Sequence, residues 1–345
     1  MRGAEQPPPM NRQAFLASSA ALVALPRIAK ATGGLDVAGQ AAQHPMRVLL
    51  ASGTFELPRP IDAWHFAWGE RTYRGSFATI ALPDGRTGLV NTLPLDAYLA
   101  GVLSKEVSPS WPAASQQAQA IVARTYALGK LRPLKLYDVV ASEADQRYDG
   151  IDGESVEGRS AVEMTGGTIV TFAGAPAHVA YSSCCGGETA DSGDVWNTPY
   201  PYLRAIVDPH CANSPGYTWQ VDVPTTAMQS AFGSDLAGIG TLRAVELAAT
   251  SPADRPRAIR FIGESATFEA SPNRFRSSLG TSVVRSTFVR AVAFAPGASS
   301  VSVSGTGHGH GVGLCQWGAR EFGAGGASAH DIVAFYFPGT DLGRA

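Results

Sequence analysis

The sequence predicts an α+β fold with mixed, mostly antiparallel β-sheet regions and a central helix pair that forms a cleft. Short runs of alternating apolar and polar residues begin at Met46 and are separated by Gly, Pro and Asp, which is typical of paired strands. Two stretches between Leu95 and Leu128 place apolar residues three and four positions apart, the spacing of one helix face. Further strand-like and helix-like runs alternate after the pair.

The N-terminal residues resemble an export signal in their order. A basic, polar lead precedes an Ala/Leu-rich stretch from Phe15 to Leu25, so residues 1–32 are predicted to be a signal peptide, with Met10 as an alternative start. The apolar run is shorter than the roughly 20 residues that span a membrane. Residues 33–45 are expected to be a linker and 46–345 one domain with an α/β subregion around 218–290. We therefore expect an exported protein of the periplasm or cell wall.

Composition excludes one large class of function. The chain has 345 residues, 45% of them hydrophobic, which is ample for a core. The formal net charge is −2 and only 16% of residues are charged. No basic patch for nucleic acid is visible, so nucleic-acid binding is not expected.

The strands before the helix pair are expected to form a small antiparallel region. Their aromatic residues are predicted to pack in the core rather than to stack on sugars. The runs are MRVLLAS, HFAWG, TYRGSFATIAL and GRTGLVNTL, and the aromatic residues are Trp64, Phe66, Trp68 and Tyr73.

The helix pair frames one acidic residue. The first helix is predicted over Leu95–Lys105, beginning next to Pro94, and the second from about Pro112 to Leu128. Glu106 falls at the end of the first helix, where the negative end of the helix dipole disfavours a carboxylate. The nearby indole of Trp111 would also desolvate it, so we expect a raised pKa. Such an acid can donate a proton to a leaving oxygen, although a solvated glutamate at a frayed helix end is the alternative.

Later segments add helices, strands and two glycine-rich stretches. A helix is predicted over Val156–Thr165, closed by two glycines. TIVTF and AHVAYSS read as strands, AMQSAFGSDL as a helix, and TLRAVELAATS and AIRFIGES as strands. The Gly-rich stretches are SSCCGGETADSGDVW and GTGHGHGVGLCQWGA; glycines there allow close approach of the backbone to a ligand or strand.

The cysteines leave three alternatives open. The chain has four, Cys184, Cys185, Cys211 and Cys315. Outside the cytosol they could form disulfides, such as Cys185 with Cys211. A structural zinc site and free buried thiols are the other two possibilities, because the spacing alone is not a zinc signature.

The helix pair resembles the stage II sporulation protein D (SpoIID)/LytB family. That family carries a similar LP-x-x-x-Y-L-x-G-V-x-x-x-E-x-x-x-x-W-P run followed by A-Q-A-x-x-A-R-T-Y-A, which here spans Leu93–Ala127. The resemblance extends over roughly Met46 to Thr340 and implies a SpoIID-like fold. It also implies that Glu106 is the catalytic acid of a peptidoglycan lytic transglycosylase.

The resemblance implies further site residues. Similar Q-x-Y-x-G, S-x-x-G-G-x-T and G-H-G-V-G-x-x-Q-x-G-A elements make the following residues candidates for substrate binding: Gln146, Tyr148, Ser183, Thr189, His310, Gln316 and Trp317. His308 lies outside the motif, and His330 is expected at the surface or in a cap. An N-x-F-R-x-x-L-G element contains Arg274 and Arg276. These two residues could contact an anionic polymer or could serve in packing or helix capping, and both alternatives are open.

Zinc is implied for some family members, through histidine and cysteine ligands. His178 and Cys184 match the first two positions, but Glu188, Thr189 and Ala190 stand where the later ligands are expected. The candidate zinc ligands are therefore His178, Cys184 and Cys211, with Cys185, His210 or Cys315 as further candidates. Such a zinc would be structural, because the chemistry itself requires no cofactor.

The resemblance also implies a reaction and a partner. Glu106 would cleave the MurNAc–GlcNAc bond of denuded glycan strands and leave a 1,6-anhydroMurNAc end. The stem peptides would be removed beforehand by an N-acetylmuramoyl-L-alanine amidase. The alternative is a non-catalytic amidase enhancer or wall-binding protein of the LytB kind.

Overall fold

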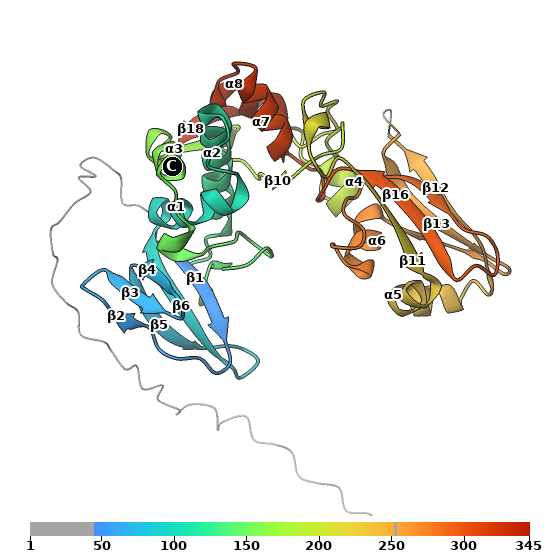
Figure 1. Cartoon of the computed structure of the whole chain (residues 1–345), viewed down its shortest axis with the longest axis horizontal. Helices are drawn as coiled ribbons and strands as arrows, with labels where there is room; N and C mark the ends of the chain where they lie inside the picture. The colour runs from blue at the N-terminus through green and yellow to red at the C-terminus, as the bar shows by residue number, and fades with distance from the viewer. Residues whose placement is uncertain (1–44, 252–253) are drawn as a thin grey trace, which may run out of the picture. The chain divides into compact units, whose positions relative to one another are not determined.

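The computed structural model describes residues 45–251 and 254–345, and it confirms the predicted α+β class (Figure 1). Eight α-helices and several small sheets make up this part of the chain, and the strand pairs within the sheets are antiparallel except for β1–β7 and β10–β17. The predicted signal peptide and nearly all of the predicted linker lie outside the described residues. No helix in the described part is both long and apolar enough to cross a bilayer.

Two small sheets come first in the chain. One has the strand order β5-β6-β1-β7 and the other β2-β3-β4. They contain β1 (Pro45–Ser52), β2 (Arg59–Pro60), β3 (His65–Trp68), β4 (Arg71–Arg74), β5 (Ser76–Ala81), β6 (Thr87–Pro94) and β7 (Val139–Val140). Tyr73 is buried as predicted, whereas Trp64 is 42% exposed. The prediction for Trp64 is wrong because it lies in the turn that joins β2 to β3.

The predicted helix pair is present. It consists of α1 (Leu95–Glu106) and α2 (Ala113–Lys130), and α3 (Val156–Met164) packs against both. Apolar residues of α1 at the predicted spacing, including Tyr98, Leu99 and Val102, are buried. Pro94 precedes α1, and extended backbone at Val107 ends it. The predicted cleft between the two helices is not confirmed; a pocket of about 300 Å³ lies beside the start of α2 and α3.

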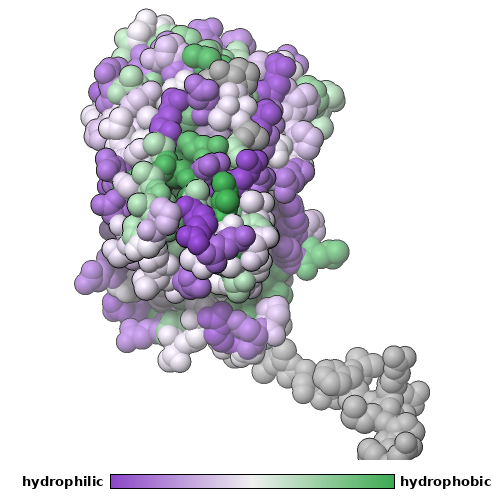
Figure 2. Space-filling model, turned by 90° about the vertical axis from the view of Figure 1, so that its right-hand side faces the viewer, coloured by the Kyte–Doolittle hydropathy of each residue, from purple (hydrophilic) through white to green (hydrophobic). Residues whose placement is uncertain are grey.

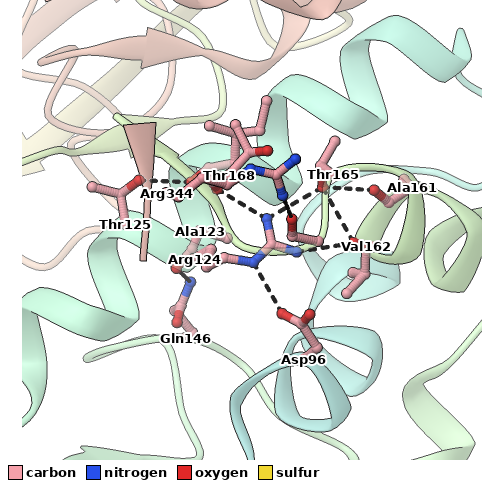
Figure 3. Close-up of polar contacts among 12 residues, drawn as sticks. Asp96, Ala123, Arg124, Thr125, Gln146, Ala161, Val162, Thr165, Thr168 and Arg344 are labelled. Atoms are coloured by element: carbon pink, nitrogen blue, oxygen red, sulfur yellow. Dashed lines mark hydrogen bonds and ion pairs between the residues drawn. The ribbon is translucent and has the colours of Figure 1, made fainter. Parts of the chain in front are cut away.

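A buried arginine holds the three helices together (Figure 3). Arg124 of α2 is 1% exposed and its Nε donates to Asp96 Oδ1 of α1 at 2.9 Å. Its Nη2 donates to the carbonyl of Val162 in α3 at 2.9 Å, and its Nη1 donates to the Thr168 carbonyl at 3.1 Å. A buried cation with this many partners has its hydrogen-bonding needs met.

The middle and the end of the chain share a second core. β10 (Tyr181–Ser182) pairs in parallel with β17 (Leu314–Cys315), so segments more than 130 residues apart lie side by side. The other elements are β8 (Thr168–Phe172), β9 (Ala175–Pro176), α4 (Ser192–Trp196), α7 (Gln316–Ala324), α8 (Ala329–Tyr336), β18 (Asp341–Arg344) and the 3₁₀ helices η1 (Gly150–Gly153) and η2 (Cys211–Asn213). Of AHVAYSS, predicted as a strand, only Tyr181–Ser182 pairs.

The expected α/β subregion has its own core. It contains β11 (Thr218–Pro224), α5 (Thr225–Ala237), β12 (Leu242–Thr250), β13 (Pro256–Gly263), β14 (Thr267–Ala270), α6 (Pro272–Leu279), β15 (Val289–Ala293) and β16 (Ser300–Thr306). Phe232, Phe261 and Phe275 are buried together in it. Figure 2 shows a face of the molecule on which hydrophilic and hydrophobic residues are interspersed.

Candidate functional site

Glu106 is the last residue of α1, and residues from distant parts of the chain hold its carboxyl group. Gln316 Nε2, at the start of α7, donates to Glu106 Oε2 at 3.3 Å. The Tyr181 hydroxyl of β10 and the backbone N–H of Arg147 also hydrogen-bond the carboxyl. Three donors from three segments thus orient one acid.

Burial raises the pKa of Glu106 above its ordinary value. The hydrogen bonds from Gln316, Tyr181 and Arg147 oppose the rise but do not cancel it, and the charge of Glu143 adds to it. The direction of this pKa shift agrees with the expectation from the sequence. Desolvation by burial is its largest cause. The group is therefore suited to give up a proton and to take one back.

A second layer fixes the tyrosine. Gln146 Nε2 donates to the Tyr181 hydroxyl at 3.1 Å, and the Tyr98 hydroxyl donates to Gln146 Oε1 at 3.2 Å. Gln146 is fully buried, so the structure places this predicted substrate-binding residue behind Tyr181. Each hydroxyl in such a chain polarises the next, which strengthens the bond to the carboxyl.

His310 holds the backbone of the same tyrosine. Its Nδ1 accepts from the Val312 N–H at 3.0 Å, and the ring also hydrogen-bonds the backbone of Tyr181. Burial lowers the pKa of His310 to about 4, with nearby Arg276 adding to the effect, so the ring is neutral near pH 7. His310 therefore positions Tyr181, while His308 is exposed.

Two tryptophans meet close to the segments that carry Glu106 and its partner Gln316. Trp111, just before α2, meets Trp317, which directly follows Gln316, edge to face with ring centroids 5.0 Å apart. Both rings are partly exposed, and Trp111 also lines the pocket beside α3. Partly exposed indoles of this kind can stack on sugar rings.

Three other predicted substrate-binding residues have local structural partners. Tyr148 is 2% exposed, and its hydroxyl donates to Asn91 Oδ1 at 3.1 Å, which places it in the core. Thr189 is buried, and its hydroxyl donates to the Arg204 carbonyl at 2.8 Å. Ser183 accepts the Trp317 N–H at its carbonyl oxygen at 3.0 Å. Their substrate roles stay predictions, and their contacts show how the loops around Glu106 are held.

The metal ligands predicted from the sequence do not all meet. His178 stacks on Tyr200 with ring centroids 4.7 Å apart, whereas Cys184 lies against Cys211. Within the described residues, the side chains that converge as metal ligands are Cys185, Asp208, Cys211 and Cys315. His178 is not among them, because the turn after β10 directs the cysteines towards η2 and β17.

Sequence reasoning missed Tyr181 as a partner of Glu106. The residue lies inside AHVAYSS, which reads as an ordinary strand. Its position two residues before the Gly-rich SCCGG bend is the one local sign that its side chain lies near the site. The hydrogen bond itself depends on pairing with β17, which local sequence does not reveal.

The fold and the site define an α+β protein in which a single pKa-raised carboxyl is held by amide, phenol and backbone donors. Residues 83–172 match the family model described as SpoIID, stage II sporulation protein. An uncharacterized protein of Brachyspira hyodysenteriae is 30% identical over 279 residues, covering 78% of this chain and 72% of that protein.

Two proteins of Bacillus species are also similar. The amidase enhancer of Bacillus subtilis is 28% identical over 292 residues, which cover 71% of this chain and 40% of that protein. Stage II sporulation protein D of Bacillus amyloliquefaciens is 25% identical over 285 residues, covering 77% and 79%. The chain belongs to the stage II sporulation protein D/LytB family.

Proposed function

We propose that this chain is an extracytoplasmic cell-wall enzyme, a lytic transglycosylase that cleaves the MurNAc–GlcNAc bond of peptidoglycan glycan strands. The observation that carries the proposal is the carboxyl group of Glu106, whose pKa burial raises and which Gln316 and Tyr181 hold in place. Membership in the SpoIID/LytB family supports a function at the cell wall.

The mechanism needs one carboxyl group. Ordinary glycosidases use two carboxylates, but here the sugar supplies the nucleophile. Protonated Glu106 gives its proton to the glycosidic oxygen as the bond from that oxygen to C1 of MurNAc breaks. The 6-hydroxyl of the same MurNAc then attacks C1, and its proton passes to the Glu106 carboxylate. The product is a 1,6-anhydroMurNAc end, and the enzyme returns to its starting state.

Neighbouring residues would assist by position and charge. Once Glu106 has lost its proton, hydrogen bonds from Gln316, Tyr181 and the Arg147 N–H stabilise the carboxylate. Trp111 and Trp317 offer ring faces and edges for the sugars on either side of the bond. Glycan already stripped of stem peptides would fit best, which makes an amidase the expected partner.

The first test is digestion of denuded glycan strands by wild type and Glu106→Gln. Wild type should release fragments with 1,6-anhydroMurNAc ends, detected by mass spectrometry, and Glu106→Gln should lower the rate by at least about a hundredfold because the amide cannot donate the proton. Glu163→Gln is the matched control: Glu163 is an exposed carboxylate of α3, and the same change there should leave the rate nearly unchanged. Intact glycan after wild-type treatment, or equal rates for Glu106→Gln and wild type, would refute the enzyme.

The second candidate is a non-catalytic amidase enhancer. It is favoured by the similarity to the Bacillus subtilis protein of that name, of which this chain matches 40%. It predicts that the protein accelerates a wall amidase on intact peptidoglycan and that Glu106→Gln retains the acceleration. The two candidates thus differ in the behaviour of one variant.

A further inference from the structure

All four cysteines of the chain meet in one buried cluster, although they come from three separate segments. Cys184 and Cys185 follow β10, Cys211 begins η2, and Cys315 ends β17. Cys185 Sγ and Cys211 Sγ are 3.5 Å apart. A buried thiol is inert on its own and can occur singly in a core, but the convergence of thiols from three distant segments indicates a shared ligand.

A carboxylate completes the set. The ligand atoms of Cys185, Asp208, Cys211 and Cys315 all lie within 4.8 Å of one another, and all four residues are buried. The Cys185 thiol donates to Asp208 Oδ2 at 3.1 Å. Four mutually close donors, three of them sulfur, match the number and kind of ligands in a tetrahedral zinc site.

The surroundings supply the contacts that a metal–thiolate centre requires. The Tyr336 hydroxyl donates to Asp208 Oδ2 at 2.9 Å. The N–H groups of Cys185 and Gly318 donate to Cys315 Sγ at 3.2 and 3.3 Å. Hydrogen bonds of this kind orient ligands and stabilise thiolate charge.

A buried cation adds to the same picture. Arg255 is 5% exposed, and its Nη2 donates to the Cys185 carbonyl at 2.7 Å. Its other hydrogen-bonded partners are a threonine hydroxyl and the Glu188 carbonyl, and the charges of Cys185 and Glu188 also act on it. Three thiolates and one carboxylate around Zn²⁺ carry a net negative charge, and a nearby guanidinium offsets part of it.

We propose that Cys185, Cys211, Cys315 and Asp208 bind one structural Zn²⁺. This ligand set differs from the one that the family resemblance implies, because it omits His178 and leaves Cys184 beside the site. The ion would tie together the turn after β10, η2 and the start of α7, and Gln316 directly follows the ligand Cys315. The site would thereby fix two partners of Glu106 without touching the substrate.

The test begins with metal content. The full chain is reduced, incubated with equimolar ZnCl₂ and separated from free metal, and zinc is then measured by elemental analysis. Wild type should retain one zinc per chain, and its cobalt form should show thiolate-to-cobalt charge-transfer absorption with a tetrahedral pattern. These readouts do not involve glycan cleavage, so the site and the proposed function can fail separately.

Variants distinguish the ligands. Cys211→Ser and Asp208→Asn should weaken zinc binding by at least about tenfold, while Cys184→Ser, the matched control, should retain it. Retention by Asp208→Asn with loss by Cys184→Ser would overturn the proposed ligand set.

Thiol counting covers the remaining outcomes and does not depend on whether a variant folds. Denatured wild type with chelator should titrate four thiols. A protein as purified that titrates two thiols and is lighter by two hydrogens would contain a disulfide, which would overturn the proposal. Four thiols in a folded wild type that retains no zinc would overturn it as well.

Discussion

At the scale of single residues, Glu106 combines two opposing influences. Burial favours its protonated form, while its three hydrogen bonds favour the carboxylate. A proton donor that must later act as a base needs both forms within reach. The balance can be shifted by removing one donor.

Tyr181→Phe should move the pH profile of glycan cleavage. Loss of the hydroxyl removes a bond that lowers the pKa of Glu106, so the pKa rises and the alkaline limb of kcat/KM moves up by about one pH unit. Tyr126→Phe is the control, because Tyr126 packs against Tyr181 with its hydroxyl on Asp145. An unchanged limb in Tyr181→Phe would show that Glu106 is not the titrating group.

His310 should make stability depend on pH. Its pKa is about 4 in the folded protein and about 6.5 in an unfolded chain, so the unfolded state binds the proton more tightly. The stability contribution of the neutral ring is therefore complete above pH 6.5 and is lost as the pH falls towards 4, by at most about 1.4 kcal/mol per pH unit. Urea unfolding of wild type and His310→Gln between pH 7 and 4 checks this: the difference between them should shrink as the pH falls, and a constant difference would contradict it.

At the scale of elements, the helix trio depends on one side chain. Arg124→Met should lower the free energy of unfolding by roughly 3 to 5 kcal/mol, because Asp96 and the carbonyls of Val162 and Thr168 lose their shared donor. Arg260→Met, which breaks the exposed pair with Glu269, should cost less than about 1 kcal/mol. Chemical denaturation measures both, and equal losses would argue against Arg124 as the link between the helices.

Most element boundaries could be predicted because local chemistry sets them. Pro94 and the break at Val107 define α1, and the alternation from Met46 gives β1. The strand predicted over AHVAYSS forms only at its end. Both Val179 and Ala180 are buried, and the backbone bonds to groups outside a β-ladder: the His178 N–H donates to the Tyr202 hydroxyl. Apolar composition alone does not distinguish a strand from an extended segment that crosses a core.

At the scale of the molecule, Arg255 connects the cysteine-bearing loop with the β11–β16 region. It donates to the carbonyls of Cys185 and Glu188 and to the Thr287 hydroxyl, and it lies over the Phe288 ring at 4.2 Å. Burial lowers the pKa of Arg255 to about 10, so it stays charged near neutral pH.

Arg255→Met should uncouple the two regions. Thermal unfolding followed by calorimetry is expected to shift to lower temperature and to separate into two transitions, since the carbonyls lose their donor. Arg257→Met is the control: Arg257 lies two residues further along, in β13, and forms an exposed ion pair with Asp194, so its loss should leave the profile nearly unchanged. One unaltered transition in Arg255→Met would show that the regions are coupled by other contacts.

The site itself could be predicted only in part. Glu106 was found because it sits between two helical patterns and a Trp-Pro loop, and Gln316 and Trp317 because they lie in a Gly-rich motif. The supporting roles of Gln146 and His310 depend on which atoms meet across β10 and β17, and no local pattern encodes that. His178 matched a motif by spacing, but the fold directs its ring to Tyr200.

The bond between Gln316 and Glu106 joins residues 210 positions apart. During synthesis Glu106 is therefore made long before Gln316, whose amide orients it. β10, which carries Tyr181, is likewise made long before its partner β17. In a partly synthesised chain the carboxyl group of Glu106 would lack the hydrogen bonds that orient it. The order of synthesis would thus keep Glu106 without its hydrogen-bond partners until the C-terminal segments have been made.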